Sequence, residues 1–87
     1  MSWCVYIIQC KDSKLYTGIT NNLERRIKAH NNGIASRFTR SHKPVKLVHS
    51  ERCSTKSKAL KREAGIKALP RNKKLALIKG NKSIEIK

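Results

Sequence analysis

Residues 4–10 read CVYIIQC and residues 15–19 read LYTGI, with the polar segment KDSK between them. Two β-favouring segments on either side of a short polar turn predict a β-hairpin. Each predicted strand carries one tyrosine, Tyr6 and Tyr16, and the sequence has no other. Because side chains alternate between the two faces of a strand, the tyrosines share a face only if the connecting loop has an odd number of residues. We therefore predict an odd-length loop of three or five residues.

The whole chain is short and strongly basic. It has 87 residues, with 21 Lys and Arg against five Asp and Glu, and a formal net charge of +16. A chain of this length forms one domain with a small core. The excess of positive charge predicts a polyanionic partner, and nucleic acid is the first candidate. A merely solubilising surface and an anionic membrane surface are the alternatives.

Cysteine usage and hydropathy predict where the protein resides. Cys4, Cys10 and Cys53 have neither the spacing of a disulfide framework nor that of a zinc site. We expect them to be small buried side chains in a reducing compartment. No apolar run approaches the ~20 residues that cross a bilayer, and the first residues do not resemble a signal peptide. These features predict a soluble, cytoplasmic protein.

A helix is expected directly after the hairpin. Asn21 and Glu24 have the spacing of a capping box, and Gly33 is placed to end the helix. Within this helix Arg26 and His30 lie four residues apart, on a stripe that is otherwise apolar. The stripe either turns towards solvent at its edge or faces a polar pocket beside the core.

The rest of the chain predicts one more strand and two more helices. The strand covers residues 45–51, and the next helix is capped by Ser54 or Thr55 and ends near Leu69. Pro70 is well placed to begin the last helix, which Gly80 ends.

These elements define the predicted fold class. It is an α+β domain, β-β-α-β-α-α, with a small three-stranded, mainly antiparallel sheet flanked by helices. One domain covers residues 1–80, and residues 81–87 form a tail.

The small number of Asp and Glu residues limits which of them can bind a metal or take part in catalysis. Four of the five have predicted structural positions in the turn, the capping box, the third strand and the tail: Asp12, Glu24, Glu51 and Glu85. Glu63 lies on the stripe predicted to face the core, with Leu60, Ala64 and Lys67. An i,i+4 salt bridge with Lys67 is the structural explanation. If the protein acts on phosphodiesters with a metal, Glu63 can hold one Mg²⁺-type ion together with several waters.

Arg26, His30 and the tyrosines are the other candidates for chemistry. An arginine can hold a phosphate bidentately and stabilise developing charge, and a histidine can move a proton near neutral pH. A solvated helix face and ordinary strand aromatics are the alternatives. A phenol is a poor base unless cations or a metal lower its pKa from about 10, and we expect both near the tyrosines.

Two motifs resemble the signature of the GIY-YIG endonuclease superfamily. The first is CVY, nine residues, then YTG at residues 4–18; the second is NLERR followed by His30, at residues 22–30. A glutamate in the helix after the third strand completes the pattern. Cys4 and Thr17 replace a glycine and an isoleucine of the motif, and no asparagine matches the one that many members carry after the glutamate. The resemblance covers residues 3–79 and is closest to small stand-alone bacterial members similar to the amino-terminal domain of excinuclease C.

The resemblance implies Mg²⁺- or Mn²⁺-dependent hydrolysis of one DNA strand per site. Tyr6 or Tyr16 would activate the attacking water, and Arg26 would stabilise the charge on the phosphate. His30 would assist proton movement, and Glu63 would be the sole protein ligand of the single metal ion. Which residue is the general base stays open.

The leading hypothesis is therefore a structure-directed or weakly sequence-specific DNA endonuclease in DNA repair or recombination. Its phosphate-gripping residues are expected to be Lys28, Arg37, Arg40, Lys43, Lys56, Lys58 and Arg62. The second hypothesis is a nucleic-acid-binding module that does not cut or needs a protein partner. A third is an RNA-associated basic protein, although four aromatic residues offer little base stacking.

Overall fold

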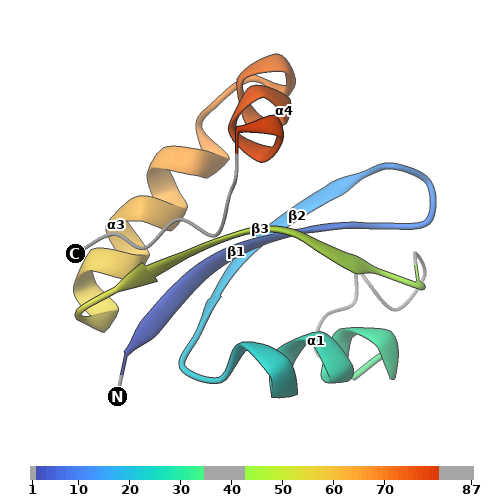
Figure 1. The fold of residues 1–87 in the computed structure, drawn as a ribbon, viewed down its shortest axis with the longest axis horizontal. Helices are drawn as coiled ribbons and strands as arrows, with labels where there is room; N and C mark the ends of the chain where they lie inside the picture. The colour runs from blue at the N-terminus through green and yellow to red at the C-terminus, as the bar shows by residue number, and fades with distance from the viewer. Residues whose placement is uncertain (1, 35–42, 81–87) are drawn as a thin grey trace.

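A computed structural model describes residues 2–34 and 43–80. These residues form a three-stranded sheet and three helices in the order β-β-α-β-α-α, so the predicted α+β class is confirmed (Figure 1). The elements are β1 (Trp3–Gln9), β2 (Leu15–Thr20), α1 (Leu23–Asn31), β3 (Lys46–Cys53), α3 (Lys56–Lys67) and α4 (Arg71–Lys79). None of these helices is long and apolar enough to cross a membrane.

The hairpin has the odd-length loop that was predicted. The Cys10 backbone N–H donates to the Lys14 carbonyl over 2.8 Å, which leaves the three residues 11–13 as the loop. Ser13 has a φ of 70°, as expected for the left-handed last position of a three-residue hairpin loop. Tyr6 consequently pairs with Gly18, and Ile8 pairs with Tyr16, so both tyrosines lie on the same face.

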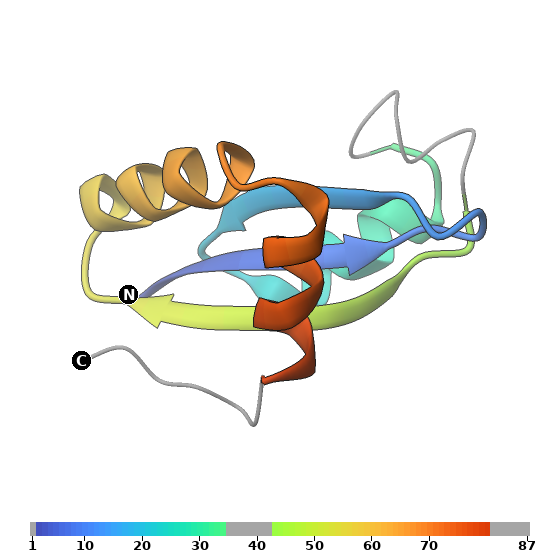
Figure 2. The same cartoon turned by 90° about the horizontal axis from the view of Figure 1, so that it is seen from above.

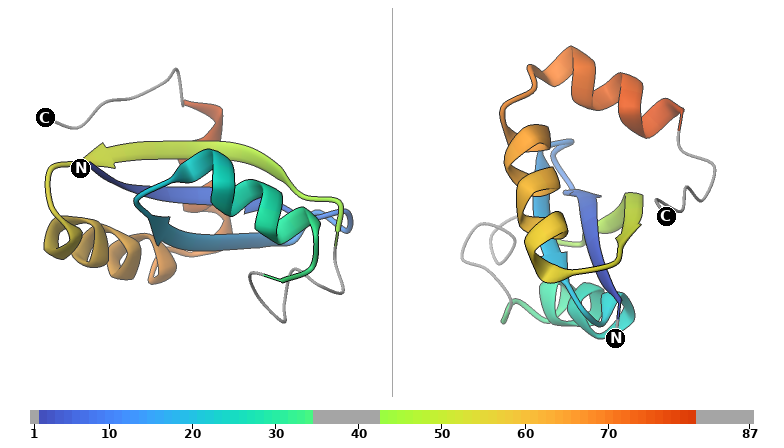
Figure 3. Two further views of the ribbon diagram at one scale, coloured as in Figure 1. Left: turned by 90° about the horizontal axis from the view of Figure 1, so that it is seen from below. Right: turned by 90° about the vertical axis from the view of Figure 1, so that its left-hand side faces the viewer.

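The sheet has the strand order β2-β1-β3 and is antiparallel throughout. Helix α1 lies across one face, and α3 and α4 cover the other (Figures 1, 2 and 3). The α1 face contains one hydrophobic cluster of buried residues, Tyr6, Ile8, Cys10 and Val45. The opposite face contains the second, Val5, Ile7 and Ile66, against which α4 places Leu77 and Ile78. Each helix layer therefore has its own small core.

Helix α1 begins one residue later than predicted. Its N-cap is Asn22, not Asn21, and the Asn22 side chain accepts a hydrogen bond from the Arg25 N–H over 3.1 Å. The reason is local: the Thr20 hydroxyl accepts the backbone N–H of Asn22 over 3.1 Å and so fixes the cap residue. Glu24 pairs with Lys28 instead of closing a capping box. Gly33, with a φ of 76°, ends the helix as predicted.

Helix α3 presents a different face to the sheet from the one predicted. Thr55 is its N-cap, and its fully buried residues are Ala59 and Ile66, seven positions apart. Leu60 was predicted to face the core but is 46% exposed. The spacing of Ala59 and Ile66 leaves Glu63 on the inward side, where its side chain is 19% exposed. At the next helix, Pro70 is the N-cap and α4 begins at Arg71.

A buried polar trio lies on the α3 side of the sheet. Glu51 and His49, both on β3, are almost completely buried. His49 Nε2 donates to Glu51 over 2.6 Å, and Arg62 of α3 donates twice to the same carboxylate, over 2.6 and 3.0 Å. Burial alone would raise the pKa of Glu51, but the hydrogen bonds from Arg62 and His49 outweigh burial and lower it. The trio thus holds α3 against β3 through the Arg62–Glu51 hydrogen bonds.

Arg62→Met tests whether this pair holds the helix. The substitution leaves a buried carboxylate without its cation, so the free energy of unfolding should fall by about 2–3 kcal/mol. Lys61→Gln is the control, because Lys61 is the exposed neighbouring base on the same helix. Urea denaturation followed by circular dichroism measures both. Equal stability of the two variants would contradict the assignment, and Glu51→Gln/Arg62→Met should recover part of the loss.

Candidate active site

The two tyrosines and His30 form one cluster between the sheet and α1. The Tyr6 hydroxyl and His30 Nε2 share a buried hydrogen bond of 2.9 Å. The Tyr16 ring lies with its centroid 5.1 Å from that of His30 and 6.5 Å from that of Tyr6. Tyr6 and His30 are 2% and 0% exposed, whereas Tyr16 is only partly buried. Tyr16 is therefore the tyrosine that a substrate can reach.

Gly18 makes this cluster possible. It pairs with Tyr6 across the hairpin, and the Tyr6 ring lies against its backbone. A Cβ at position 18 would lie 2.6 Å from the Tyr6 hydroxyl oxygen and 3.2 Å from the Tyr16 ring. Any side chain at this position must displace a tyrosine.

The hydrogen bond joins two neutral groups at neutral pH. Burial raises the pKa of Tyr6 well above its usual value; Tyr16 and Glu63 add to the increase, and Arg26 opposes it. Burial also lowers the pKa of His30, and the charge of Arg26 lowers it further. The expected lowering of a phenol pKa by nearby cations therefore does not occur at Tyr6, because burial outweighs Arg26.

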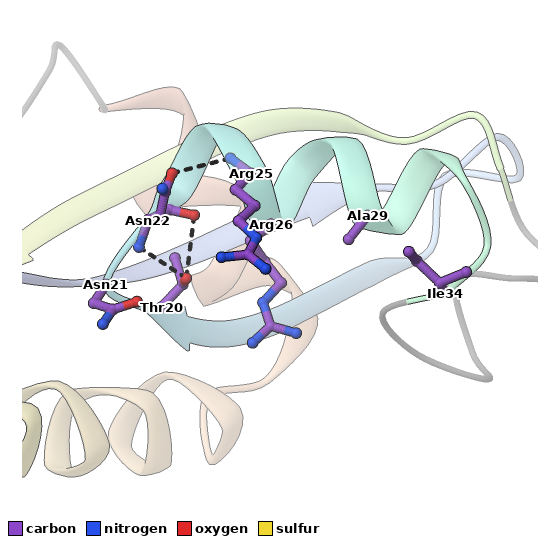
Figure 4. Close-up of a pocket in the computed structure, with 7 residues that line it drawn as sticks. All are labelled: Thr20, Asn21, Asn22, Arg25, Arg26, Ala29 and Ile34. Atoms are coloured by element: carbon purple, nitrogen blue, oxygen red, sulfur yellow. Dashed lines mark hydrogen bonds between the residues drawn. The ribbon is translucent and has the colours of Figure 1, made fainter.

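Arg26 lies at the exposed border of this cluster. Together with Arg25 it lines a hollow of about 300 Å³ at the start of α1. Figure 4 shows both side chains extending from the helix on the side where β2 ends. The remaining lining residues are Thr20, Asn21, Asn22, Ala29 and Ile34. The positive charge of Arg26 lowers the pKa of both Tyr6 and His30. Arg25 was not singled out as a site residue from the sequence, although the NLERR motif contains it.

Glu63 approaches the cluster from the opposite helix layer. Its carboxylate forms an i,i+4 ion pair with Lys67, at 3.4 Å. This is the structural role that the sequence predicts for Glu63 as the alternative to metal binding. The negative charge of the same carboxylate also raises the pKa of Tyr6. Lys67 and Tyr16 line a common hollow. The structure thus brings Tyr6, Tyr16 and His30 into contact, and the charges of Arg26 and Glu63 act on Tyr6.

A metal at this position would depend on a single protein carboxylate. Within residues 2–34 and 43–80, no three His, Cys, Asp or Glu side chains gather into a group that could hold a metal ion. One carboxylate completed by water and substrate phosphate is nevertheless a common arrangement for Mg²⁺. Glu63 fits that arrangement.

The basic residues predicted to grip phosphates are scattered. Arg62 is occupied by the buried Glu51, so the structure gives it a different task. Lys56 lies over the Trp3 ring, with its Nζ 5.2 Å from the ring centroid. Three others are exposed: Lys28, Lys43 and Lys58. Arg37 and Arg40 lie outside the described residues.

Comparison with known families identifies the family of the chain. The sequence profile of the GIY-YIG catalytic domain matches residues 2–76. The chain belongs to the GIY-YIG family. A UPF0213 protein of Clostridium perfringens is 58% identical over 81 residues, which cover 93% of this chain and 86% of the relative. A UPF0213 protein of Staphylococcus saprophyticus is 51% identical over 74 residues, covering 85% and 90%.

Two solved structures of similar chains have the same fold. The solution structure of a UPF0213 protein from Bacillus halodurans is 39% identical, with a TM-score of 0.60, and the alignment covers 91% of this chain and 84% of that one. A second solution structure, of an E. faecalis protein, is 38% identical, with a TM-score of 0.62 and the same coverage.

Gly18→Ala tests the packing of the tyrosines in this GIY-YIG domain. The new methyl group must push Tyr6 from its hydrogen bond, so the free energy of unfolding should fall by about 1–3 kcal/mol. Gly65→Ala is the control, because a Cβ there meets nothing within 4 Å in the middle of α3. It should raise stability by about 0.4–1 kcal/mol. Urea unfolding and the NMR signals of the His30 ring measure the effect; unchanged stability and unchanged His30 signals in Gly18→Ala would contradict it.

Proposed function

We propose that this GIY-YIG protein is an endonuclease that hydrolyses DNA phosphodiester bonds with the aid of one divalent metal ion. The observation that carries the proposal is the contact of Tyr16 with a buried, neutral Tyr6–His30 pair, beside Arg26 and Glu63. A nucleophile-activating group, a proton acceptor, a cation for the phosphate and a carboxylate for a metal are the parts that such a reaction needs.

Arg26 would bind the phosphate to be cut. It lines the hollow at the start of α1, and Arg25, which lines the same hollow, doubles the positive charge. A guanidinium at this position binds the phosphate oxygens and stabilises the negative charge that builds up as water attacks. The N-terminal N–H groups of α1 add a favourable field for an anion.

Tyr16 and His30 would handle the attacking water and its proton. Tyr16 is accessible, so its hydroxyl can hold the water against the phosphate. Tyr6 is buried and cannot meet the water; its role is to hold the His30 ring in place. His30 is buried as well, so its neutral imidazole would receive the proton by relay: the Tyr16 hydroxyl takes a proton from the water and passes its own to His30, whose ring it adjoins. As the water oxygen bonds to phosphorus, the bond between phosphorus and the leaving oxygen breaks, and the leaving oxygen takes a proton from solvent.

Glu63 would hold the Mg²⁺ or Mn²⁺ ion. A bound divalent ion polarises the phosphate and lowers the pKa of a coordinated water. Lys67 must give up part of its ion pair with Glu63 when the carboxylate binds a metal. Since Lys67 also lines the hollow beside Tyr16, its ammonium group can turn to a phosphate instead.

DNA recognition would be structure-directed or weakly sequence-specific. The net charge of +16 favours contacts to the phosphate backbone, and those carry no base information. The three free cysteines are compatible with a reducing, cytoplasmic setting, where DNA repair or recombination is the process we assign.

A second candidate function is a nucleic-acid-binding module that does not cut by itself. The ion pair between Glu63 and Lys67 favours it, because the carboxylate that acts on Tyr6 is then already neutralised. Such a module would need a protein partner to supply a further metal ligand.

Cleavage assays with matched glutamate variants separate the two. The protein is incubated with Mg²⁺ and duplex, nicked or branched DNA, and the nicks are measured on denaturing gels. Glu63→Gln should slow cleavage by about 100-fold or more and leave DNA binding intact. Tyr16→Phe should slow it by about 10²–10⁴-fold. Glu24→Gln is the control, since Glu24 forms the same type of i,i+4 ion pair on the exposed side of α1.

The outcomes are distinct. Loss of cleavage in Glu63→Gln, with a normal rate in Glu24→Gln, supports the endonuclease. Equal cleavage by wild type and Glu63→Gln would point to a contaminating nuclease and refute the site. Binding of every substrate without cleavage, also with EDTA-treated protein reloaded with Mn²⁺, would establish the binding module instead.

A further inference from the structure

Several basic side chains that were not assigned to DNA contact line one continuous groove. The hollow beside Tyr16, of about 300 Å³, is lined by Leu15, Tyr16, Thr17, Lys67 and Lys74. A second hollow, of about 270 Å³, is lined by Lys14, Leu15, Arg71 and Lys74. Because both contain Leu15 and Lys74, they adjoin. We call these seven residues the β2 groove.

The β2 groove joins the candidate active site to the hairpin turn. It begins at Tyr16, whose ring also contacts His30. At its far end the Arg71 guanidinium donates to the Ser13 carbonyl over 2.8 Å, which ties the start of α4 to the turn. The groove thus runs between β2 and the start of α4, away from the cluster.

The groove is strongly cationic. Four of its seven lining residues are Lys or Arg, and none is acidic. Two of the four are partly neutralised, Lys14 by Asp12 at 3.7 Å and Lys67 by Glu63 at 3.4 Å. Lys74 and Arg71 form no ion pair with any residue of the described segments. Leu15 and Tyr16 line the groove between the charges and add apolar surface, which suits the sugars of a nucleic-acid strand better than a small inorganic anion.

We propose that the β2 groove binds the phosphodiester backbone of DNA on one side of the phosphate that is cut. The proposal rests on the proposed function for its ligand, because it places the cut phosphate at Tyr16. It assigns DNA-binding roles to Lys14, Lys67, Arg71 and Lys74. It also gives the substrate strand a direction across the molecule, from the start of α1 past Tyr16 to the hairpin turn.

Salt-dependent binding of the whole chain tests the groove without cleavage. All variants are made in the Glu63→Gln protein, and their affinity for a fluorescent DNA duplex is measured by fluorescence anisotropy at a series of salt concentrations. Lys74→Gln should reduce the slope of log K against log salt by about 0.9, and Lys14→Gln/Lys74→Gln by about twice that. Lys73→Gln is the matched control: it removes the same charge from the exposed neighbouring position of α4, outside the groove. Equal slopes and affinities for Lys74→Gln and Lys73→Gln would overturn the proposal.

A double-mutant cycle with modified DNA locates the contact. Methylphosphonates replace single phosphates with neutral groups at each position around the cut. If Lys74 binds one of these phosphates, the loss from Lys74→Gln and the loss from that methylphosphonate should not add. The coupled position should lie within a few nucleotides on one side of the cut. Additive losses at every position would overturn the proposal.

The readouts separate this inference from the proposed function. If the chain binds DNA but never cuts, coupling between Lys74 and one phosphate still supports the groove while the endonuclease fails. If Lys74→Gln lowers the single-turnover rate at saturating protein without changing affinity, the groove is refuted and the enzyme stands. A Lys74→Gln effect seen with RNA duplex but not with DNA would also overturn it.

Discussion

The hydrogen bond between Tyr6 and His30 is the contact on which the arrangement of this site depends. It joins residues that are 24 positions apart and fastens α1 to the central strand of the sheet. Both groups are buried, so neither could lose its partner without leaving a polar atom unsatisfied. Burial also keeps both of them neutral at physiological pH, since it raises the pKa of the phenol and lowers that of the imidazole. A pair of this kind can pass a proton without carrying a permanent charge.

The second constraint is that the sheet buries both of its faces in a chain of only 87 residues. The hydrophobic cluster on each face is small, and a buried polar contact on each face also holds a helix to the sheet. On the α1 face this contact is the Tyr6–His30 hydrogen bond. On the other face Arg62 donates two hydrogen bonds to Glu51. Because β2 is an edge strand, both helix layers reach it: the Tyr16 ring contacts His30 of α1, and Tyr16 lines a hollow together with Lys67 of α3. The edge strand is thus where the two helix layers share a surface.

Much of this could be predicted from the sequence, for reasons that are local. The parity of strand pairing requires an odd loop if the tyrosines are to share a face, and the loop is odd. Helix and strand patterns placed each element within a few residues. The errors also have physical causes. The Thr20 hydroxyl moves the helix cap from Asn21 to Asn22. Burial of Ala59 and Ile66 turns α3 by one position from the predicted stripe, which began at Leu60.

Three features could not be predicted, because they depend on contacts between segments that are far apart in the sequence. Arg62 counts as a free cation in the sequence, but β3 places the buried Glu51 beside it. The sign of the Tyr6 pKa shift depends on how completely α1 covers the ring. The β2 groove needs the start of α4 to meet the hairpin turn through Arg71, 58 residues from Ser13. Without that contact, the sequence gives no reason to place Lys14 and Lys74 in one groove.

The proposed chemistry requires that one DNA phosphate is held between Arg26 and Tyr16, with the metal ion on Glu63. A crystal of the protein with Mn²⁺ and a DNA duplex carrying a slowly cleaved phosphorothioate can show this arrangement, because anomalous scattering locates the ion. We expect one Mn²⁺ bonded to the Glu63 carboxylate and to a phosphate that also contacts Arg26 and Tyr16. A phosphate bound elsewhere, with Glu63 still paired to Lys67 and no ion beside it, would contradict the proposed site.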